Sequence, residues 1–299
     1  MMAVAKDLKV QGDIRFNEPM SRHTSWRVGG PAEIFFVPSS IDDLASFLAE
    51  LDADTPLFWH GVGSNLLVRD AGLPGVVISA SKMLKHIERV GDRQVRAGAG
   101  MPCTSLARQC VRWQLGPSEF FAGIPGTVGG ALAMNAGAHG GETWERVASV
   151  QTIDRSGVVR QRGPDDYTVG YRSVVGPPNE WFLEAVFEFD PAIKPSVQAM
   201  KSMLDRRKET QPLGLPSCGS VFRNPPGDYS ARLIETAGLK GYRIGGAEVS
   251  TKHANFIINR DDATASDIEE LIEHVRKAVL EAHGVNLKHE VRIVGEAPS

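Results

Sequence analysis

The chain has 299 residues, of which 42% are hydrophobic and 23% are charged. This length exceeds one typical domain and allows a sizeable core, so we expect two or three modest domains. Lys and Arg number 33 against 36 Asp and Glu, which gives a formal net charge of −3. Such a balance provides no global positive field for nucleic acid or an anionic membrane, so any anionic ligand must be bound locally.

The sequence contains no predicted export, membrane or metal-binding segment. Its first twenty residues carry several charges and no apolar run of signal-peptide length, and nowhere do eighteen apolar residues follow one another. We therefore expect a soluble, cytoplasmic protein without membrane insertion. Cys103, Cys110 and Cys218 include no C-x-x-C pair. Their odd number and spacing predict reduced thiols and no metal site.

A β-α-β-β pattern opens the chain. EIFFV at 33–37 predicts a strand, and Ser40 followed by Asp43 predicts a capped helix with apolar residues at helical spacing. Further strands are predicted at 57–60 and 76–80. This order indicates a small α/β layer.

Strands separated by turns are predicted for the middle of the chain. Turn signals occur at 91–93 and 154–157, and one helix is expected to begin at Pro102 and end near Gly116. EWFLEAVFEFD at 180–190 alternates in polarity, which predicts a strand with one face more exposed to solvent than the other.

The C-terminal third is predicted to form a further α/β unit. We expect helices near 195–209, 229–237 and 266–284, and strands at 255–259 and 290–294. Ser266 with Glu269 predicts a capping box at the start of the last helix.

The segment 123–141, GIPGTVGGALAMNAGAHGG, holds seven glycines in nineteen residues and hardly a charge. This composition exposes backbone N–H groups and suits a pyrophosphate, although a pair of closely packed turns would need the same residues. The segment is not a Walker A sequence. GVGSNL at 61–66 lacks the third glycine of the dinucleotide fingerprint, which argues against a Rossmann fold.

Six motifs occur in a fixed order along the chain. They are HTSWRVGGPA at 23–32, GVGSNLLVRD at 61–70, EFFAGIPGTVGGALAMNAGAHG at 119–140, YRS at 171–173, CGSVFRNP at 218–225 and HEVRIVG at 289–295. Together they resemble the UDP-N-acetylenolpyruvoylglucosamine reductase family over nearly the whole length. The short stretch between Tyr171 and the strand at 180–190 resembles the branch that lacks an extra substrate-covering loop.

The resemblance implies an α/β (α+β) protein with an FAD-binding fold of the vanillyl-alcohol-oxidase (PCMH) type. Two FAD-binding subdomains, 1–82 and 83–194, would be followed by a substrate-binding domain at 195–299. It also implies non-covalent FAD, NADPH as reductant, and UDP-GlcNAc-enolpyruvate as substrate, reduced to UDP-N-acetylmuramate for peptidoglycan precursor synthesis. We expect a monomer.

The resemblance further implies that the two glycine-rich motifs contact the FAD pyrophosphate and isoalloxazine, mostly through backbone donors. The expected contacts are Gly61, Gly63, Ser64, Asn65, Leu66, Gly123, Pro125, Gly126, Gly129, Gly130 and Asn135. Trp26, Phe120 and Phe121 could pack on the flavin or fill the core.

Three residues match the family's catalytic positions. Hydride addition to the β-carbon of an enol ether leaves negative charge on the α-carbon and its carboxylate, so the site needs a cation and a proton donor. Arg172 and Glu290 match the positions that polarise and stabilise this intermediate, and Ser220 matches the proton donor. Without the family, Ser220 would be interpreted as an ordinary turn serine.

Polar side chains near these motifs are candidates for substrate binding. They are Tyr171, Arg223, Asn224, Tyr229, Lys252 and His253. For Arg223 and Lys252 the alternative is a solvated surface cation.

Two other functions are compatible with parts of this sequence. A different flavoprotein of the same fold, such as an oxidase or dehydrogenase acting on a small alcohol, would need a base where Ser220 is expected to be an acid, and would not require the CGSVFRNP and HEVR motifs. A non-catalytic nucleotide-binding module would not require Arg172, Ser220 and Glu290 together.

Overall fold

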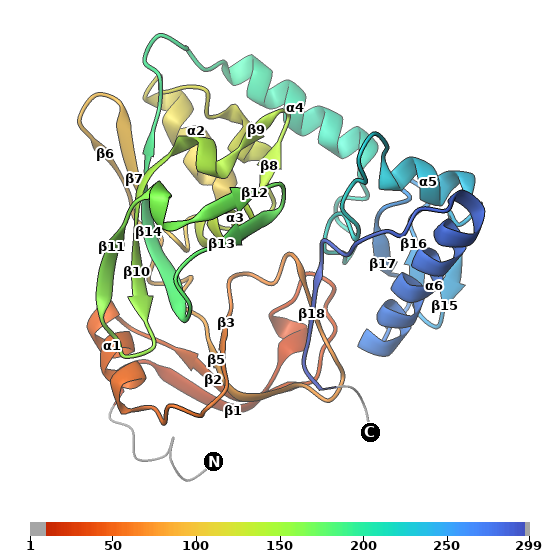
Figure 1. The fold of residues 1–299 in the computed structure, drawn as a ribbon, viewed down its shortest axis with the longest axis horizontal. Coiled ribbons are helices and arrows are strands. Elements are labelled where there is room, and N and C mark those ends of the chain that lie inside the picture. The colour runs from red at the N-terminus through yellow and green to blue at the C-terminus, as the bar shows by residue number, and fades with distance from the viewer. Residues whose placement is uncertain (1–9, 297–299) are drawn as a thin grey trace. The chain divides into compact units, whose positions relative to one another are not determined.

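The computed structural model describes residues 10–296, which divide into two units (Figure 1). Unit 1 contains residues up to 15, 34–61 and 75–207, and unit 2 contains 16–33, 62–74 and those from 208 onward. Two N-terminal segments therefore pack with the C-terminal part of the chain. The predicted boundary at residue 82, between two FAD-binding subdomains, and the one at residue 194, before the substrate-binding domain, stay predictions.

A five-stranded antiparallel sheet forms the centre of unit 1, with the order β11-β10-β14-β7-β6. Its strands are β6 (Ile87–Val90), β7 (Gln94–Gly98), β10 (Val147–Asp154), β11 (Val159–Arg162) and β14 (Glu180–Glu188). The turns predicted at 91–93 and 154–157 connect neighbouring strands of this sheet, as expected. Alternation along β14 is also confirmed, because Leu183, Ala185 and Phe187 are buried.

Two helices pack against the apolar face of this sheet and enclose a core. The helix predicted at Pro102 is α2 (Cys103–Arg112), and α3 (Val128–Met134) contacts β14 and β7. Phe121 lies edge-on to Phe187 of β14, with 5.3 Å between ring centroids. Phe120 and Phe121 are both buried in this core.

The N-terminal sheet has the strand order β1-β2-β5-β3. Its strands are β1 (Asp13–Pro19), β2 (Pro31–Val37), β3 (Leu57–Trp59) and β5 (Leu73–Ile78). The predicted helix is α1 (Ile41–Glu50), and the Ser40 hydroxyl accepts the Asp43 N–H as its cap. Phe47 of α1 stacks on Phe36 of β2 at 4.2 Å, which buries the helix against the sheet.

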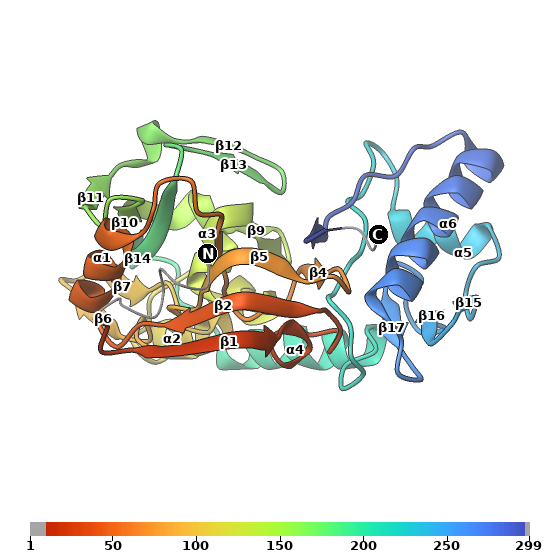
Figure 2. The ribbon, with the colours of Figure 1, turned by 90° about the horizontal axis from the view of Figure 1, so that it is seen from below.

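Unit 1 also carries two short hairpins and a long helix. The hairpins are β8–β9 (Gly137–Ala138 and Gly141–Glu142) and β12–β13 (Thr168–Gly170 and Ser173–Val175), and the helix is α4 (Val197–Thr210). Figure 2 shows β12 and β13 running side by side.

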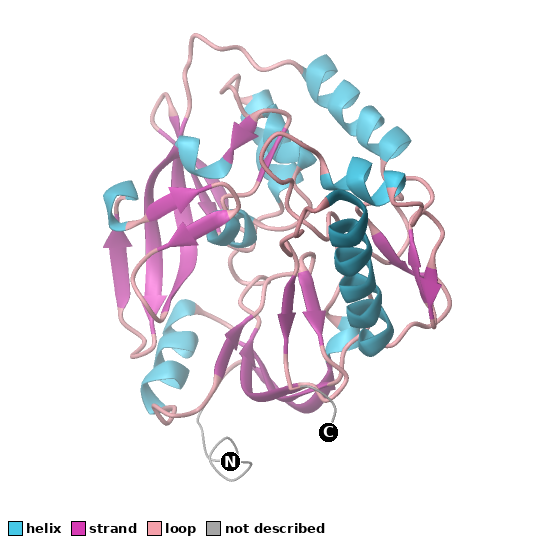
Figure 3. Cartoon of the chain, turned by 45° about the vertical axis from the view of Figure 1, so that its right-hand side comes forward, coloured by secondary structure: helices cyan, strands magenta, loops and turns pink. Residues whose placement is uncertain are grey.

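Unit 2 contains a three-stranded antiparallel sheet, β15-β16-β17, covered by α6 (Figure 3). Its elements are α5 (Ser230–Thr236), β15 (Arg243–Ile244), β16 (Ala247–Val249), β17 (Ile257–Asn259) and α6 (Ala265–His283). The capping box predicted at Ser266 is wrong. The cap is Thr264, whose side chain accepts the Asp267 N–H, while the Ser266 hydroxyl bonds to Asp70.

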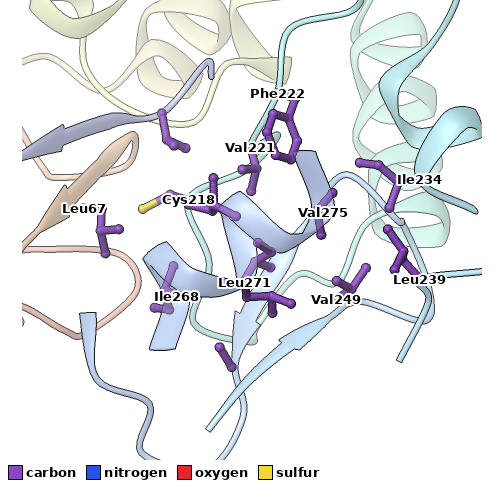
Figure 4. Close-up of a cluster of buried hydrophobic side chains, with 14 of the residues drawn as sticks. Leu67, Cys218, Val221, Phe222, Ile234, Leu239, Val249, Ile268, Leu271 and Val275 are labelled. Atoms are coloured by element: carbon purple, nitrogen blue, oxygen red, sulfur yellow. The ribbon is translucent and has the colours of Figure 1, made fainter. Parts of the chain in front are cut away.

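The core of unit 2 joins segments that lie far apart in the sequence (Figure 4). Leu67 packs in one cluster with Phe222 and with Leu271 of α6. Trp26 is fully buried in the same cluster, and its indole N–H donates to the Ile257 carbonyl at 2.8 Å, so it is a core residue. The final strand, β18 (Arg292–Val294), pairs in parallel with β4 (Leu66–Val68).

Candidate active site

The glycine-rich segment of unit 1 wraps around the start of α3. The Val128 N–H donates to the Met101 carbonyl at 2.9 Å, and the Gly129 N–H donates to the Ala99 carbonyl at 2.8 Å. A Cβ on Gly129 would lie 2.9 Å from the Ala99 Cβ. Gly129 is therefore required for close packing of the helix on its neighbour.

Two other glycines face open space beside one hydroxyl. A Cβ on Gly61 or Gly130 would meet a single atom within 4 Å, the Thr127 Oγ1, at 3.7 and 3.9 Å respectively. Thr127 is buried at the N-cap of α3, and its side chain makes no capping hydrogen bond. Gly61 and Gly130 therefore leave room beside the Thr127 hydroxyl, which suits an oxygen-rich group such as a pyrophosphate.

Sequence reasoning missed Thr127. Its signal was a local one, because a threonine that directly precedes a helix is a preferred N-cap residue. Thr127 follows Gly126, which has a φ of +131° and whose carbonyl accepts the Cys103 N–H at 3.0 Å. Gly126 therefore lets the chain turn into the helix while α2 holds the turn in place.

Asn135 ends α3 in the left-handed conformation, and its buried side chain is used by the protein itself. The amide Nδ2 donates to Glu142 Oε2 at 2.7 Å and to the Gly170 carbonyl at 3.2 Å. Its Oδ1 accepts the Trp144 N–H at 3.1 Å. Asn135 thus ties the glycine-rich segment to the β12–β13 hairpin, and its predicted contact with FAD stays a prediction.

Arg172 occupies the turn of that hairpin with a φ of +53°, a conformation that is uncommon for residues other than glycine. Its Nη2 donates to the Gly137 carbonyl at 3.0 Å, and its Nη1 donates to the Asn135 carbonyl at 3.4 Å. The guanidinium also lies 5.4 Å from the centroid of the exposed Tyr171 ring. The arginine is therefore held against the glycine-rich segment of unit 1.

From Val62 onward, the second glycine-rich motif belongs to unit 2. A Cβ on Gly63, whose φ is +63°, would lie 2.1 Å from the His23 carbonyl, and the Gly63 carbonyl accepts the Ser25 N–H at 3.0 Å. Ser64, half-buried, follows directly. The Asn65 side-chain amide donates to the Glu290 carbonyl at 3.0 Å, so this motif directly contacts the backbone of the predicted catalytic glutamate.

Unit 2 brings the Ser220 segment next to Glu290. The Glu290 N–H donates to the carbonyl of Val221 at 2.8 Å, so the two predicted catalytic residues lie on adjoining segments. The Cys218 thiol donates to the Gly63 and Leu66 carbonyls at 3.5 Å each. Ser220 and Glu290 are both half-buried. Arg172 belongs to unit 1.

The predicted substrate-binding side chains of unit 2 differ in exposure. Asn224, Tyr229 and Lys252 are exposed, and Asn224 Oδ1 accepts the Ser230 N–H at the start of α5. The Lys252 ammonium donates to the Lys208 carbonyl at 2.5 Å. Arg223 Nε and His253 Nδ1 are buried without a hydrogen-bond partner in the described part of the chain.

Burial sets the pKa of several groups in these segments. Desolvation raises the pKa of the Cys218 thiol to about 12, and burial alone raises that of Cys110 to about 12. Desolvation is also the largest effect on His253 and on His139, and it lowers both pKa values. All three cysteines are buried and free, as expected. Within residues 10–296 no group of three or more His, Cys, Asp or Glu side chains could hold a metal ion.

Comparison with known proteins gives two family matches. Residues 32–162 match an FAD binding domain, and residues 211–294 match the C-terminal domain of UDP-N-acetylenolpyruvoylglucosamine reductase. The reductase of that name from Alkalilimnicola ehrlichii is 58% identical over 300 residues, covering 100% of both chains. That from Methylococcus capsulatus is 55% identical over 282 residues, covering 94% of this chain and 93% of the other. The chain belongs to the UDP-N-acetylenolpyruvoylglucosamine reductase family.

A crystal structure of a UDP-N-acetylenolpyruvylglucosamine reductase from Thermus caldophilus superposes with a TM-score of 0.79. It is 29% identical, and the match covers 95% of this chain and 99% of that one. The prediction of an FAD-binding fold followed by a C-terminal domain, in the shorter branch of the UDP-N-acetylenolpyruvoylglucosamine reductases, is confirmed. The chain is thus a flavin-dependent oxidoreductase. No helix among the described residues is long and apolar enough to cross a membrane.

Proposed function

We propose that the protein uses NADPH and non-covalently bound FAD to reduce UDP-GlcNAc-enolpyruvate to UDP-N-acetylmuramate. The observation that carries this proposal is the hydrogen bond from the Glu290 N–H to the Val221 carbonyl, which holds a carboxylate residue beside the segment that begins with Ser220. Membership of the reductase family supports the choice of substrate. An alcohol oxidase of the same fold would not need these two segments.

The residues of unit 1 fit FAD. Gly61 and Gly130 leave room beside the Thr127 hydroxyl. Gly63, Ser64, Asn65 and Leu66 are proposed as FAD contacts because they belong to the same motif as Gly61. Gly123, Pro125, Gly126, Gly129 and Asn135 complete the proposed contacts. When bound, the flavin supplies hydride transfer between NADPH and the substrate.

Arg172 is proposed to hold the substrate carboxylate. A hydride added to the β-carbon of the enol ether leaves an electron pair and negative charge on the α-carbon and its carboxylate. A guanidinium can fork onto a carboxylate through two N–H groups and so stabilise that charge. Glu290 is proposed to help polarise and stabilise the same intermediate.

Ser220 is proposed to protonate the α-carbon. A neutral alcohol is a poor acid near pH 7, but a carbanion-like intermediate is basic enough to take its proton if the hydroxyl is already in place. The new C–H bond forms at the α-carbon while the O–H bond of Ser220 breaks. The product then carries a saturated lactyl ether.

The UDP part of the substrate is proposed to bind the polar side chains of unit 2. Arg223 and His253 are proposed contacts, and the burial of Arg223 Nε argues against a purely solvated role for this cation. Asn224, Tyr229 and Lys252 are exposed and could reach a diphosphate, an N-acetyl group or a uracil. Tyr171, beside Arg172, is proposed as a further substrate contact.

The proposed activity is tested by two half-reactions. The purified protein should carry bound flavin, which anaerobic NADPH bleaches and UDP-GlcNAc-enolpyruvate restores. A protein without flavin, or a reduced flavin that ignores this substrate, would refute the proposal. Ser220→Ala should keep the flavin reduction rate within about twofold of wild type and slow substrate reduction by about 100-fold or more, in line with the usual contribution of a general acid. Equal loss of both rates would contradict the role of Ser220.

We also propose a cytoplasmic monomer, because UDP-sugars and NADPH are intracellular metabolites. Light scattering on the FAD-loaded protein would give the mass of one chain, 32.4 kDa. A mass of two chains would contradict this.

A further inference from the structure

We propose that Asn255 is a positioning residue that fixes the Ser220 hydroxyl for proton transfer. The proposal rests on the proposed role of Ser220 as the proton donor. Asn255 belongs to none of the six motifs, and it lies between His253 and β17 in a segment whose sequence indicated only the start of a strand.

Asn255 makes three hydrogen bonds to the two residues that follow Ser220. Its side-chain Oδ1 accepts the Phe222 N–H at 2.9 Å, and its Nδ2 donates to the Phe222 carbonyl at 2.8 Å. Its own carbonyl accepts the Val221 N–H at 2.9 Å. Asn255 is 4% exposed, so water does not compete for these bonds. The amide thus acts as a strand partner for Phe222.

The opposite side of the same segment is bonded to the residues around Glu290. The Val221 carbonyl accepts the Glu290 N–H at 2.8 Å, and the Arg223 N–H donates to the Lys288 carbonyl at 2.9 Å. Phe222 and His289 form an isolated antiparallel bridge. Asn255 and the strand entering β18 therefore hold Val221 to Arg223 from both sides.

The N-terminal side of Ser220 is held by packing. Cys218 is buried in the core of unit 2, and its thiol donates to the Gly63 and Leu66 carbonyls at 3.5 Å each. Gly219, with a φ of +73°, connects this buried cysteine to Ser220. Ser220 therefore lies between a core residue and the bonded segment that follows it, and Asn255 supplies three of that segment's hydrogen bonds.

The amide is suited to this role because it donates and accepts at once. Aspartate at position 255 would keep the acceptor for the Phe222 N–H but lose the donor to the Phe222 carbonyl when ionised. A protonated aspartic acid would regain a donor. Burial raises the pKa of a carboxyl, so this regain should occur at accessible pH.

The test compares Asn255→Ala, Asn255→Asp and a control, Thr264→Ala, in the FAD-loaded full chain. Thr264 caps α6 in the same unit and bonds to Asp267, so its loss destabilises unit 2 without touching residues 220–222. For each variant, stopped-flow absorbance gives the rate of flavin reduction by NADPH and of reoxidation by UDP-GlcNAc-enolpyruvate, per bound flavin, in H₂O and D₂O.

We expect Asn255→Ala to reduce its flavin at the wild-type rate and to reoxidise about 10- to 100-fold more slowly, a part of the usual general-acid contribution. Its solvent isotope effect on reoxidation should increase, because proton transfer becomes rate-limiting. Thr264→Ala should keep both wild-type rates and the wild-type isotope effect. For Asn255→Asp, the reoxidation rate relative to wild type should fall as pH rises through the carboxyl pKa, a dependence that Asn255→Ala cannot show.

Two results separate this proposal from the proposed function. If Ser220→Ala slows reoxidation while Asn255→Ala reoxidises at the wild-type rate, or slows both half-reactions equally, the positioning role is refuted and the role of Ser220 stands. If Ser220→Ala reoxidises normally, both proposals fail. If Asn255→Ala does not fold, the test rests on Asn255→Asp. A ratio of its reoxidation rate to that of wild type that does not change with pH then overturns the proposal.

Discussion

Replacing Gly130 by alanine should stabilise the protein and weaken its cofactor binding. Gly130 lies in α3, and the added Cβ would be 3.9 Å from Thr127 Oγ1 with no other atom within 4 Å. Alanine is favoured over glycine inside a helix by about 0.5–1 kcal/mol. The free energy of unfolding of the apoprotein should therefore rise by up to about 1 kcal/mol.

FAD binding should change in the opposite direction, because the new methyl group occupies the space beside the Thr127 hydroxyl that is proposed for the cofactor. We expect a Kd for FAD at least about tenfold higher, which corresponds to about 1.4 kcal/mol. Urea unfolding of the apoprotein measures the first quantity, and a titration with FAD followed by flavin fluorescence measures the second.

Gly129→Ala is the matched control, since its Cβ would lie 2.9 Å from the Ala99 Cβ. This overpacking should lower the free energy of unfolding by about 1–3 kcal/mol. The reasoning is refuted if Gly130→Ala binds FAD with the wild-type Kd, or if it loses as much stability as Gly129→Ala.

Two further predictions concern stability. The side-chain hydrogen bond from Arg162 is the largest cause of a lowered pKa at Glu180, so the ionised Glu180 carboxylate stabilises the fold above its ordinary pKa of 4.5. This stabilisation is lost as pH falls below that value. The difference in urea midpoint between wild type and Glu180→Gln should therefore shrink from pH 7 to pH 3, and a constant difference would contradict this. Leu271 is fully buried in the core of unit 2, so Leu271→Ala should lower the free energy of unfolding by about 2–5 kcal/mol, whereas a loss below 1 kcal/mol would show that the site collapses around the gap.

Local signals in the sequence predicted several elements correctly. The α1 helix follows from Ser40 as its cap and from apolar residues at helical spacing, both of which act within a few residues. Alternation along β14 predicted its buried face for the same reason. The cap of α6 was wrong because the Ser266 hydroxyl is bonded by Asp70, 196 residues away, a contact that local spacing cannot reveal.

The site residues also divide into those that a local sequence signal indicates and those whose role comes from contacts distant in the sequence. Thr127 had a local signal, because threonine is a preferred N-cap residue. Asn255 had none, since its importance comes from bonds to Phe222, 33 positions earlier in the chain. The parallel pairing of β18 with β4, which brings Glu290 to Asn65, likewise joins segments more than 200 residues apart. Such pairings follow from tertiary packing and are not encoded by periodicity.

The central claim is that hydride reaches the β-carbon of the enol ether and that Ser220 protonates the α-carbon. A single turnover of NADPH-reduced enzyme in D₂O, with the product examined by NMR, tests this most directly, because the hydroxyl proton of Ser220 exchanges with solvent. We expect wild type to form product with one deuterium at the α-carbon of the lactyl group, in a single configuration, and Ser220→Ala to form this product about 100-fold more slowly or worse. An α-carbon without deuterium, or product formed by Ser220→Ala at the wild-type rate, would contradict the claim.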